Sequence, residues 1–419
     1  MEASIAMMSK KQHVHARDTR RLLLFFALAF TGTLAFRISM PAIAFHVRSV
    51  LEASALGVGL LTAVFFAARA GFSVIAGRIY DRFGSRASIV ATGCFALNAV
   101  AAYSYLLGDS LAWMLLIRGV QGALNGLAWV LVQAMLGDVA EESFRGRAFS
   151  VYFACGSLGI MTGNALYAML ANKPLMLVLG ASSLFFIVAA LLAFVAGREI
   201  AVTSRSRQRA KWEARSRSAG EARIVIRATL LLLVTVLGVS MYLSIAKGDL
   251  VYVLFKEIHG IKRSTVAWIV SVSTLASLLA GYLISWVSDR ISTLWALRIS
   301  TTISLAGCLL MSIGSLPVSA MGLAFFYAGT SGILPVTRRI ATTYYKMRGT
   351  VLGLVNATGN IGNIAGSMIA GYLYDAMGAK MLILGGVGIV KTEALMSTTV
   401  VLSLIASFLL RALPREKRG

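Results

Sequence analysis

The sequence predicts an all-α membrane protein with twelve transmembrane helices arranged as two pseudo-symmetric six-helix bundles. Composition is the first observation: of 419 residues, 58% are hydrophobic and only 14% are charged, and the mean hydropathy is +0.78. A soluble protein of this length could not bury so much apolar surface in its core. The second observation is a series of long apolar stretches, and the third is a repeat of glycines between the two halves of the chain.

Twelve apolar stretches are each long enough to cross a bilayer, which requires about 20 mostly apolar residues. Their approximate limits are 22–45, 55–78, 87–107, 111–136, 147–170, 174–197, 228–255, 264–288, 293–314, 317–338, 349–374 and 394–411. The last is the least sharply bounded, because the apolar segment 381–390 precedes Lys391-Thr392-Glu393 and could form part of it. The stretches lack the alternation of apolar and polar residues that marks a transmembrane β-strand. We therefore expect helices throughout.

The two halves of the chain share a pattern of small residues. Arg145-Gly146 aligns with Arg348-Gly349, and the same offset pairs three glycines of the predicted fifth helix with three of the eleventh. The paired glycines are Gly156, Gly159 and Gly163 with Gly359, Gly362 and Gly366. Small residues at this spacing line one face of a helix and allow a neighbouring backbone to approach closely. Two half-molecules built on one plan in a membrane indicate a transporter that rocks about a central site.

The formal net charge of +23 follows the predicted topology. Most Lys and Arg residues fall at one membrane face, near the two ends of the chain and in a central segment. Cytoplasmic loops are the ones enriched in Lys and Arg, so we expect both termini in the cytoplasm and the protein in the plasma membrane. Topology and attraction to anionic lipid headgroups then explain the basic excess, and no nucleic-acid partner is expected.

These observations divide the chain into five parts. They are a cytoplasmic tail (1–21), an N-terminal six-helix bundle (22–197), a basic cytoplasmic linker (198–227), a C-terminal six-helix bundle (228–411) and a second tail (412–419). The linker is rich in Arg, Ser and Glu, so it cannot bury enough apolar surface to fold alone. A helical portion lying on the membrane surface is an alternative within it. We expect the protein to be a monomer.

No pattern in the sequence predicts a cofactor, a metal site or a catalytic centre. Cys94, Cys155 and Cys308 lie in apolar stretches without paired spacing, and the four His residues are scattered. The nucleotide-binding loop Gly-x-x-x-x-Gly-Lys-Ser/Thr is absent, and no nucleophile-base motif occurs on a loop. We therefore expect a protein that is not an enzyme. Its expected partners are a small-molecule substrate and the lipid bilayer, with a coupling proton or ion as a further candidate.

A polar loop follows the second apolar stretch and reads Gly77-Arg78-Ile79-Tyr80-Asp81-Arg82-Phe83-Gly84-Ser85-Arg86. It resembles the loop signature of the major facilitator superfamily, Gly-x-x-x-Asp-Arg/Lys-x-Gly followed by basic residues, with Ser85 replacing the first of the terminal basic pair. A degraded copy in the second half retains Asp289 and Arg290 but has lost both glycines. Arg118-Gly119-Val120-Gln121-Gly122 resembles the superfamily's fourth-helix pattern, Arg-x-x-Gln-Gly. The resemblance covers essentially the whole chain.

The resemblance implies that the first loop latches the two halves together in the outward-facing state. Gly77 would let the second helix pack closely, and Gly84 would permit a turn that few other residues adopt. Asp81 can lie near a helix N-terminus or an arginine at the cytoplasmic rim, and Arg145 and the start of the eleventh helix near Gly349 are candidate partners. The alternative is an ordinary solvated turn. The candidate latch residues are Gly77, Asp81, Arg82, Gly84, Arg86, Arg145, Asp289 and Arg290.

Ionisable residues within the predicted spans indicate the substrate site, because a charge at mid-membrane costs about 2.5 kcal/mol or more and usually faces a cavity or a partner. The candidates are Arg37, Arg69, Arg118, Lys247 and Asp249, with Gln121 and Asn125 as polar neighbours of Arg118. Arg298 lies near the end of its helix and can reach the interface, so a structural role is expected there. Two alternatives stay open: Lys247 and Asp249 could neutralise one another, and Arg118 could be a structural element packed against its polar neighbours.

Three classes of function remain. The favoured one is a secondary active transporter of a small organic solute, with a carboxylate or phosphate ester held by Arg37 and Arg118. The alternative is a proton-coupled exporter of drugs or metabolites. Against it, the predicted cavity lacks an unpaired acid, and Met161-Thr162-Gly163-Asn164 lacks the Gly-Pro pair of many exporters. A non-transporting receptor or scaffold is least favoured. Asp249 is the only obvious acid within the spans and hence the candidate for proton coupling.

Overall fold

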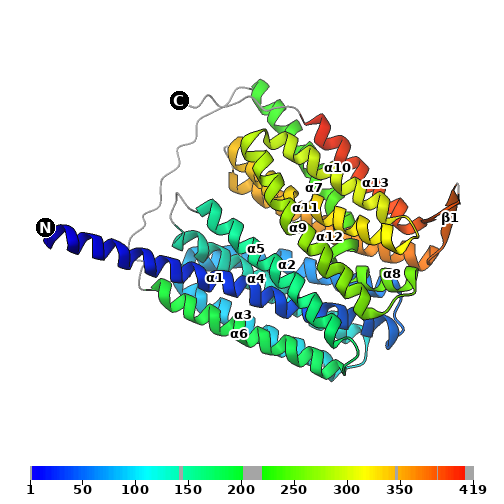
Figure 1. Ribbon diagram of the computed structural model, residues 1–419, viewed down its shortest axis with the longest axis horizontal. Coiled ribbons are helices and arrows are strands. Elements are labelled where there is room, and N and C mark those ends of the chain that lie inside the picture. Colours follow the sequence, from blue (N-terminus) through cyan, green and yellow to red (C-terminus); the bar gives the residue numbers. More distant parts are fainter. Residues whose placement is uncertain (1, 141–144, 202–218, 345–347, 385, 411–419) are drawn as a thin grey trace.

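The computed structural model describes residues 2–140, 145–201, 219–344, 348–384 and 386–410, and helices dominate it (Figure 1). The first half contains α1 (Glu2–Ser49), α2 (Ala55–Phe83), α3 (Ala87–Ser104), α4 (Leu111–Val139), α5 (Arg145–Leu170) and α6 (Leu175–Ala201). The second contains α7 (Ala219–Lys247), α8 (Leu250–His259), α9 (Arg263–Arg290), α10 (Thr293–Met311), α11 (Leu316–Tyr344), α12 (Arg348–Met377) and α13 (Lys391–Leu409). Short 3-10 turns, η1 (Gly84–Arg86) and η2 (Tyr105–Leu107), flank α3.

The helices confirm the predicted all-α membrane fold. Within the described ranges, eleven helices are long and apolar enough to cross a membrane. The twelfth predicted span, 349–374, corresponds to α12, which has 30 residues but carries Asn356, Asn360 and Asn363, whose amides lower its hydropathy. The chain is thus a multi-pass membrane protein. The helical part of α1 extends back to Glu2, while α6 and α7 reach into the two ends of the segment predicted as a linker.

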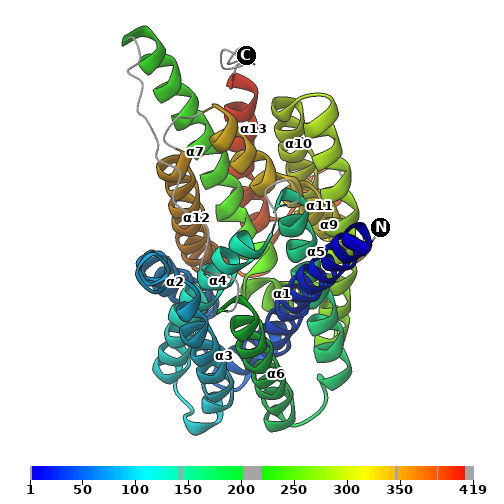
Figure 2. The same cartoon turned by 90° about the vertical axis from the view of Figure 1, so that its left-hand side faces the viewer.

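Each half packs as a bundle on the plan that the glycine repeat indicated. The first of the repeated helices, α5, lies against α1, and its counterpart α12 lies against α7 (Figure 2). A Cβ placed on Gly159 would lie 3.1 Å from Leu34 N and closer still to the Phe30 carbonyl oxygen, and one on Gly362 would lie 2.8 Å from Leu237 O. A side chain at either position would therefore force two backbones apart.

One predicted helix limit is wrong, and one alternative left open by the sequence is excluded. The span 228–255 is broken, because α7 ends at Lys247 and α8 begins at Leu250. The apolar segment 381–390 is not part of the last helix. It forms a two-stranded antiparallel hairpin of β1 (Met381–Leu384) and β2 (Val387–Val390), in which Met381 pairs with Val390. A left-handed glycine, Gly386, with φ +83°, lies in the turn, and such a turn interrupts a helix.

The two bundles meet along two seams. In one seam α2 packs against α12, and in the other α5 packs against α9. We call the end of the molecule that carries β1 and β2 the hairpin end, and the end where α6 stops and α7 starts the linker end. The bundles converge toward the hairpin end and spread toward the linker end (Figure 1), so the seams hold the molecule together chiefly on the hairpin side.

Candidate functional site

A cavity of about 310 Å³ lies between the two bundles. Its walls come from both halves, because residues of α1, α2, α4 and α5 face residues of α7 and Asn363 of α12. Four cationic side chains and one carboxylate line it, namely Arg37, Arg69, Arg118, Lys247 and Asp249. These are the five ionisable residues that the sequence singled out. Trp129, Gln133 and Tyr152 extend the lining toward the linker end.

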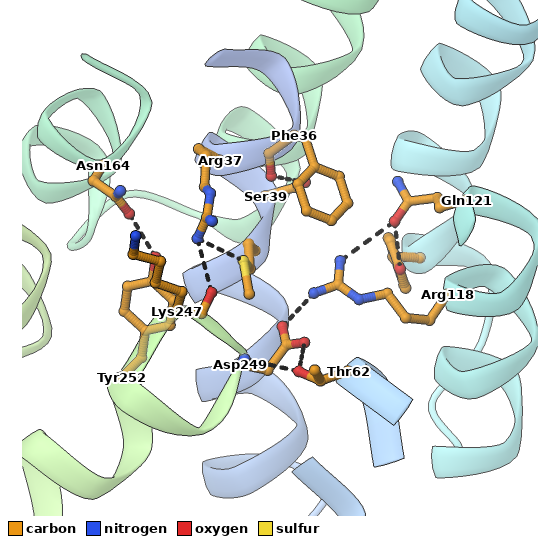
Figure 3. Close-up of polar contacts among 12 residues, drawn as sticks. Phe36, Arg37, Ser39, Thr62, Arg118, Gln121, Asn164, Lys247, Asp249 and Tyr252 are labelled. Carbon is orange, nitrogen blue, oxygen red and sulfur yellow. Dashed lines mark hydrogen bonds and ion pairs between the residues drawn. The ribbon is translucent and has the colours of Figure 1, made fainter. Parts of the chain in front are cut away.

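Arg118 of α4 and Asp249 form an ion pair across the two halves (Figure 3). Both side chains are only 1% exposed. Thr62 of α2 completes the arrangement, since its hydroxyl donates to Asp249 Oδ2 at 2.8 Å. The alternative in which Asp249 neutralises Lys247 is therefore wrong, because the carboxylate is bound to an arginine of the opposite bundle. A buried pair of this kind depends on such extra hydrogen bonds to offset the loss of water.

The break between α7 and α8 places Asp249 in this pair. Its backbone N–H donates to Thr62 Oγ1 at 3.0 Å instead of continuing the helix. A Cβ on Gly248 would lie 2.9 Å from Thr62 Oγ1 and would also collide with the Ser244 carbonyl oxygen. Glycine is thus needed for α2 to approach the break, and the freed backbone groups are accommodated because they line a cavity rather than lipid.

Arg37 and Lys247 lie side by side on the other wall of the cavity (Figure 3). Arg37 Nη1 donates to Met40 Sδ and to the Lys247 carbonyl oxygen, both at 3.2 Å. Lys247 Nζ donates to Thr330 Oγ1 at 3.1 Å and lies 4.5 Å from the centre of the Tyr327 ring. Neither cation forms an ion pair with a described residue. Their positive charge is therefore uncompensated within their own contacts.

The remaining contacts around Arg118 do not provide an acceptor for every hydrogen-bond donor there. Its guanidinium carbon lies 5.0 Å from the Phe36 ring centre and 5.8 Å from that of Phe65. Its Nη1 donates weakly to Gln121 Oε1 at 3.4 Å, which also accepts from Tyr105 at 2.9 Å. Arg118 Nε and Gln121 Nε2 are buried without an acceptor among the described residues. Local donors thus outnumber acceptors, and a ligand that accepts hydrogen bonds would balance them.

The other candidate residues hold different places. Arg69 lines the cavity near the Phe66 ring, 5.9 Å from its centre. Asn125 belongs to a polar network in which its amide donates to Gln121 O at 2.8 Å and its oxygen accepts from Trp129 Nε1 at 2.8 Å. Arg298 lies apart from the cavity and donates to the Leu410 carbonyl oxygen at 3.2 Å, at the end of α13. That contact is of the structural kind expected from the sequence.

The candidate latch loop is described only in part. The side chains of Asp81, Arg145 and Asp289 lie outside the described residues, while Arg82, Arg86 and Arg290 are exposed. Gly84 ends α2 with φ +53°, and its N–H donates to Tyr80 O, as the turn argument requires. The space where a Cβ of Gly77 would lie contains no heavy atom within 4 Å. The expected close packing at Gly77 is therefore wrong for this conformation.

The other glycines of the repeat differ in how closely a neighbouring backbone approaches them. A Cβ on Gly163 would lie 2.8 Å from Leu34 O, and one on Gly366 would meet the Met241 backbone, with Cα at 2.6 Å. Gly156 and Gly359 have ordinary room instead, with nearest atoms at 3.6 Å and 3.5 Å. Gly156 also lines the cavity. Backbone contact is thus concentrated at the two later glycines of each set.

Sequence reasoning overlooked two features. Thr62, Phe66 and Arg69 recur at helical spacing on α2 and all line the cavity, so periodicity from Arg69 could have found Thr62. Glu393 is a second buried acid, only 1% exposed, and its Oε2 has no partner among the described residues. The view of Asp249 as the only acid within the spans is therefore wrong. Glu393 was missed because it lies at the junction of hairpin and helix, outside the predicted span.

Comparison with known proteins agrees with this architecture. The family model described as the Major Facilitator Superfamily matches residues 25–255 and 244–419. The chain is 25% identical over 381 residues to the multidrug resistance protein MdtH of Photorhabdus laumondii, covering 86% of this chain and 90% of that protein. It is 23% identical to the uncharacterized MFS-type transporter YqjV of Bacillus subtilis, covering 83% and 85% of the two chains.

Solved structures share the fold at low sequence identity. The nucleoside transporter NupG superposes with a TM-score of 0.64 at 12% identity, covering 95% of this chain and 100% of that one. A bacterial homolog of the human lysosomal transporter Spinster gives a TM-score of 0.65 at 15% identity, covering 93% and 96%. At these identities the likeness concerns the fold alone.

Proposed function

Because the chain belongs to the major facilitator superfamily and so is a multi-pass membrane transporter, we propose that it moves a small organic anion by alternating access. The observation that carries this proposal is the charge of the cavity. Four cations and one carboxylate line it, which leaves a formal surplus of three positive charges (four minus one). An anion would be attracted to this surplus, and a cation would be repelled.

Arg37 and Lys247 are the favoured anion-binding pair. They come from opposite bundles, lie next to one another and form no ion pair with a described residue. A carboxylate or phosphate between them would receive charge-assisted hydrogen bonds in a poorly hydrated site. Arg69 and the donors left over at Arg118 and Gln121 extend this surface. The aromatic rings of Phe36 and Phe65 would cover the organic part of the ligand.

The Arg118–Asp249 pair couples the ligand to the motion of the bundles. Opening the hairpin end would pull α4 away from α8 and leave two buried charges unpaired, which is strongly unfavourable. A substrate carboxylate that takes the place of Asp249 on Arg118 would relieve the penalty for the arginine, and a proton on the released Asp249 would relieve it for the carboxylate. We therefore infer that the pair acts as the charge lock of the transport cycle, with a proton as the candidate coupling ion.

The membrane orientation follows from the charge pattern. We infer that the linker end faces the cytoplasm, because α6 ends and α7 begins there, on either side of the basic segment predicted to be cytoplasmic. The conformation described here, joined at the hairpin end, would then be open toward the cytoplasm. The protein would act as a monomer in the plasma membrane, surrounded by lipid. The part of the chain that the structure describes contains no cluster of three metal ligands, and the proposed cycle uses no metal.

Thermal stabilisation of the purified protein tests the substrate class. Benzoate, succinate and glycerol phosphate should raise the melting temperature, whereas ethidium and glucose should not. Arg37→Gln and Lys247→Gln should each weaken anion binding by about tenfold or more, since a charge-assisted hydrogen bond contributes about 1.5–3 kcal/mol. Arg298→Gln is the matched control and should bind as the parent does. Stabilisation by ethidium alone, unchanged in the two cavity variants, would contradict the proposal.

An exporter of drugs or metabolites is the second candidate. One relative bears the name multidrug resistance protein, and the cavity wall includes the rings of Phe65, Phe66, Trp129 and Tyr152, which suit flat apolar compounds. The carboxylate that could attract a cationic drug is already bound to Arg118. Export of an anionic or neutral compound would agree with both this candidate and the charge of the cavity. The ethidium arm of the experiment therefore separates the anion transporter from an exporter of cationic drugs.

A further inference from the structure

A second intact form of the latch-loop pattern ends α12. Residues 371–378 read Gly-Tyr-Leu-Tyr-Asp-Ala-Met-Gly, and residues 77–84 read Gly-Arg-Ile-Tyr-Asp-Arg-Phe-Gly. Both segments follow the pattern Gly-x-x-Tyr-Asp-x-x-Gly. The two lie at opposite ends of the molecule, because α2 runs from the hairpin end to the linker end and α12 runs the other way (Figure 1).

The two segments also share their local structure. Gly84 and Gly378 both have positive φ, +53° and +63°. The N–H of each glycine donates to the carbonyl oxygen of the tyrosine four residues earlier. The two tyrosines both donate their hydroxyls to a carboxylate. Tyr80 bonds Asp138 at 2.5 Å, and Tyr374 bonds Glu257 at 3.0 Å. The two segments are therefore similar in structure as well as in sequence.

The segment 371–378 is hydrogen-bonded to the first turn of α2, in the opposite bundle. Asp375 Oδ1 accepts from the Ala55 N–H at 2.7 Å, and Oδ2 accepts from the Leu56 N–H at 2.8 Å. The side chain of the helix's own N-cap, Ser54, accepts from the Gly57 N–H at 3.1 Å. The first turn of a helix leaves its N–H groups without helical partners and carries partial positive charge. Half of the cap of α2 is therefore supplied from the other bundle.

The glycine at the start of the segment makes this approach feasible. A Cβ on Gly371 would lie 2.7 Å from Leu56 Cα and 2.8 Å from Ala55 O. The tyrosine reinforces the contact, because its acceptor Glu257 also accepts from Arg48 Nε of α1 at 2.7 Å and from Arg48 Nη2 at 3.0 Å. Both the glycine and the Tyr-Asp pair of the segment thus serve contact between the bundles.

We propose that residues 371–378 are the latch of the hairpin end, which closes that end by capping α2 when the linker end is open. It is the counterpart of the latch implied for Asp81, and α2 and α12 would each cap the other's first turn, at opposite faces and in alternate states. The proposal rests on the alternating access proposed above. Asp375 is exposed, so water can replace its hydrogen bonds when the end opens, and the latch is reversible.

Spin-label distances measured without added substrate test the latch. In a background with the three cysteines replaced by alanine, labels at Leu107 and Ile383, 73% and 75% exposed, report the hairpin end. A second pair at Ile89 and Ile291 reports the linker end. Asp375→Asn should lower the ratio of closed to open hairpin ends by about fivefold, as expected for loss of a charged helix cap. Asp81→Asn should change the ratio in the opposite direction.

A donor-side variant and a matched control make the test decisive. Ala55→Pro removes the N–H that Asp375 Oδ1 accepts, and proline is tolerated at the first position of a helix, so it should open the hairpin end as Asp375→Asn does. Asn172→Ala changes the corresponding position in the first half, just after α5 and at the same offset as the glycine repeat, and should leave the distances at the parent values. Parent-like distances in both Asp375→Asn and Ala55→Pro would overturn the latch. Anion stabilisation measured on the same variants is an independent readout, so loss of the latch and loss of substrate binding are distinguishable.

Discussion

The two seams between the bundles occupy symmetry-related places but are built from different interactions. In the α2–α12 seam, backbone meets backbone: a Cβ on Gly59 would collide with the Ser367 carbonyl oxygen, and Asp375 caps the first turn of α2. In the α5–α9 seam, a buried side chain makes the link, since Ser271 Oγ donates to Met161 O at 2.8 Å. The first seam ends at an exposed carboxylate, whereas the hydrogen bond of the second is made by a buried side chain. Closure by a fold with internal symmetry therefore need not be symmetric in its chemistry.

The parts of the two seams at the hairpin end show the same contrast. The position that corresponds to Asp375 in the first half is Asn172, which follows α5 and is exposed. The buried contact near that seam joins neutral groups, with Tyr252 of α8 donating to Asn164 Oδ1 of α5 at 2.6 Å. A charged cap at the water interface is cheap to break, whereas buried neutral hydrogen bonds must be exchanged within the protein. We infer that the contacts of the α2–α12 seam break before those of the α5–α9 seam when the hairpin end opens.

Removal of the charge lock should have the largest effect, because the Arg118–Asp249 pair lies between the seams and supports both. Asp249→Asn leaves the Arg118 charge buried without its partner, which typically costs about 3–5 kcal/mol. The unfolding temperature in detergent should fall strongly. The double variant Arg118→Gln/Asp249→Asn should recover part of the loss, because no buried charge is then left alone. Equal stability of Asp249→Asn and the parent would show that the seams alone hold the closed end.

A side chain forced into the α2–α12 seam should have the next largest effect. Gly371→Leu places atoms where the Leu56 backbone lies, and overpacking of this kind costs about 1–3 kcal/mol. The spin labels at Leu107 and Ile383 should report an open hairpin end. Gly180→Leu is the control, because no heavy atom of the described chain lies within 4 Å of a Cβ there. A hairpin end that still closes in Gly371→Leu would mean that the backbone contact of this seam is dispensable.

Loss of the buried hydrogen bond in the α5–α9 seam should have the smallest effect. Ser271→Ala deletes the hydrogen bond to Met161 O, and a neutral hydrogen bond contributes about 0.5–1.5 kcal/mol. The melting temperature should fall slightly, with distances at the hairpin end close to the parent values. Ser273→Ala is matched in burial but loses only a bond to Ile269 O of its own helix. If Ser271→Ala opened the hairpin end as widely as Gly371→Leu, the contrast between the seams would disappear.

Much of the architecture was readable from the sequence. Long apolar stretches predicted the spans because lipid cannot satisfy free backbone groups, and only a helix satisfies its own within one segment. Periodic glycines predicted backbone contact because packing depends on side-chain size, and Gly159 and Gly362 meet backbones of their own bundles. The scarcity of charges within the spans singled out Arg37, Arg69, Arg118, Lys247 and Asp249, and all five line one cavity.

The partners of those residues were decided only by the tertiary structure. Proximity in sequence suggested that Asp249 would neutralise Lys247, but the break after Lys247 turned the carboxylate toward Arg118, 131 positions away. The pattern at 371–378 is visible in the sequence. Its role, however, depends on the N-terminus of α2 at Ala55, which is 320 positions away in the chain. Hydropathy and spacing are properties of one segment, so one segment reveals them. Which charge contacts which helix end depends on how the two bundles pack against each other, and that packing exists only in the folded chain.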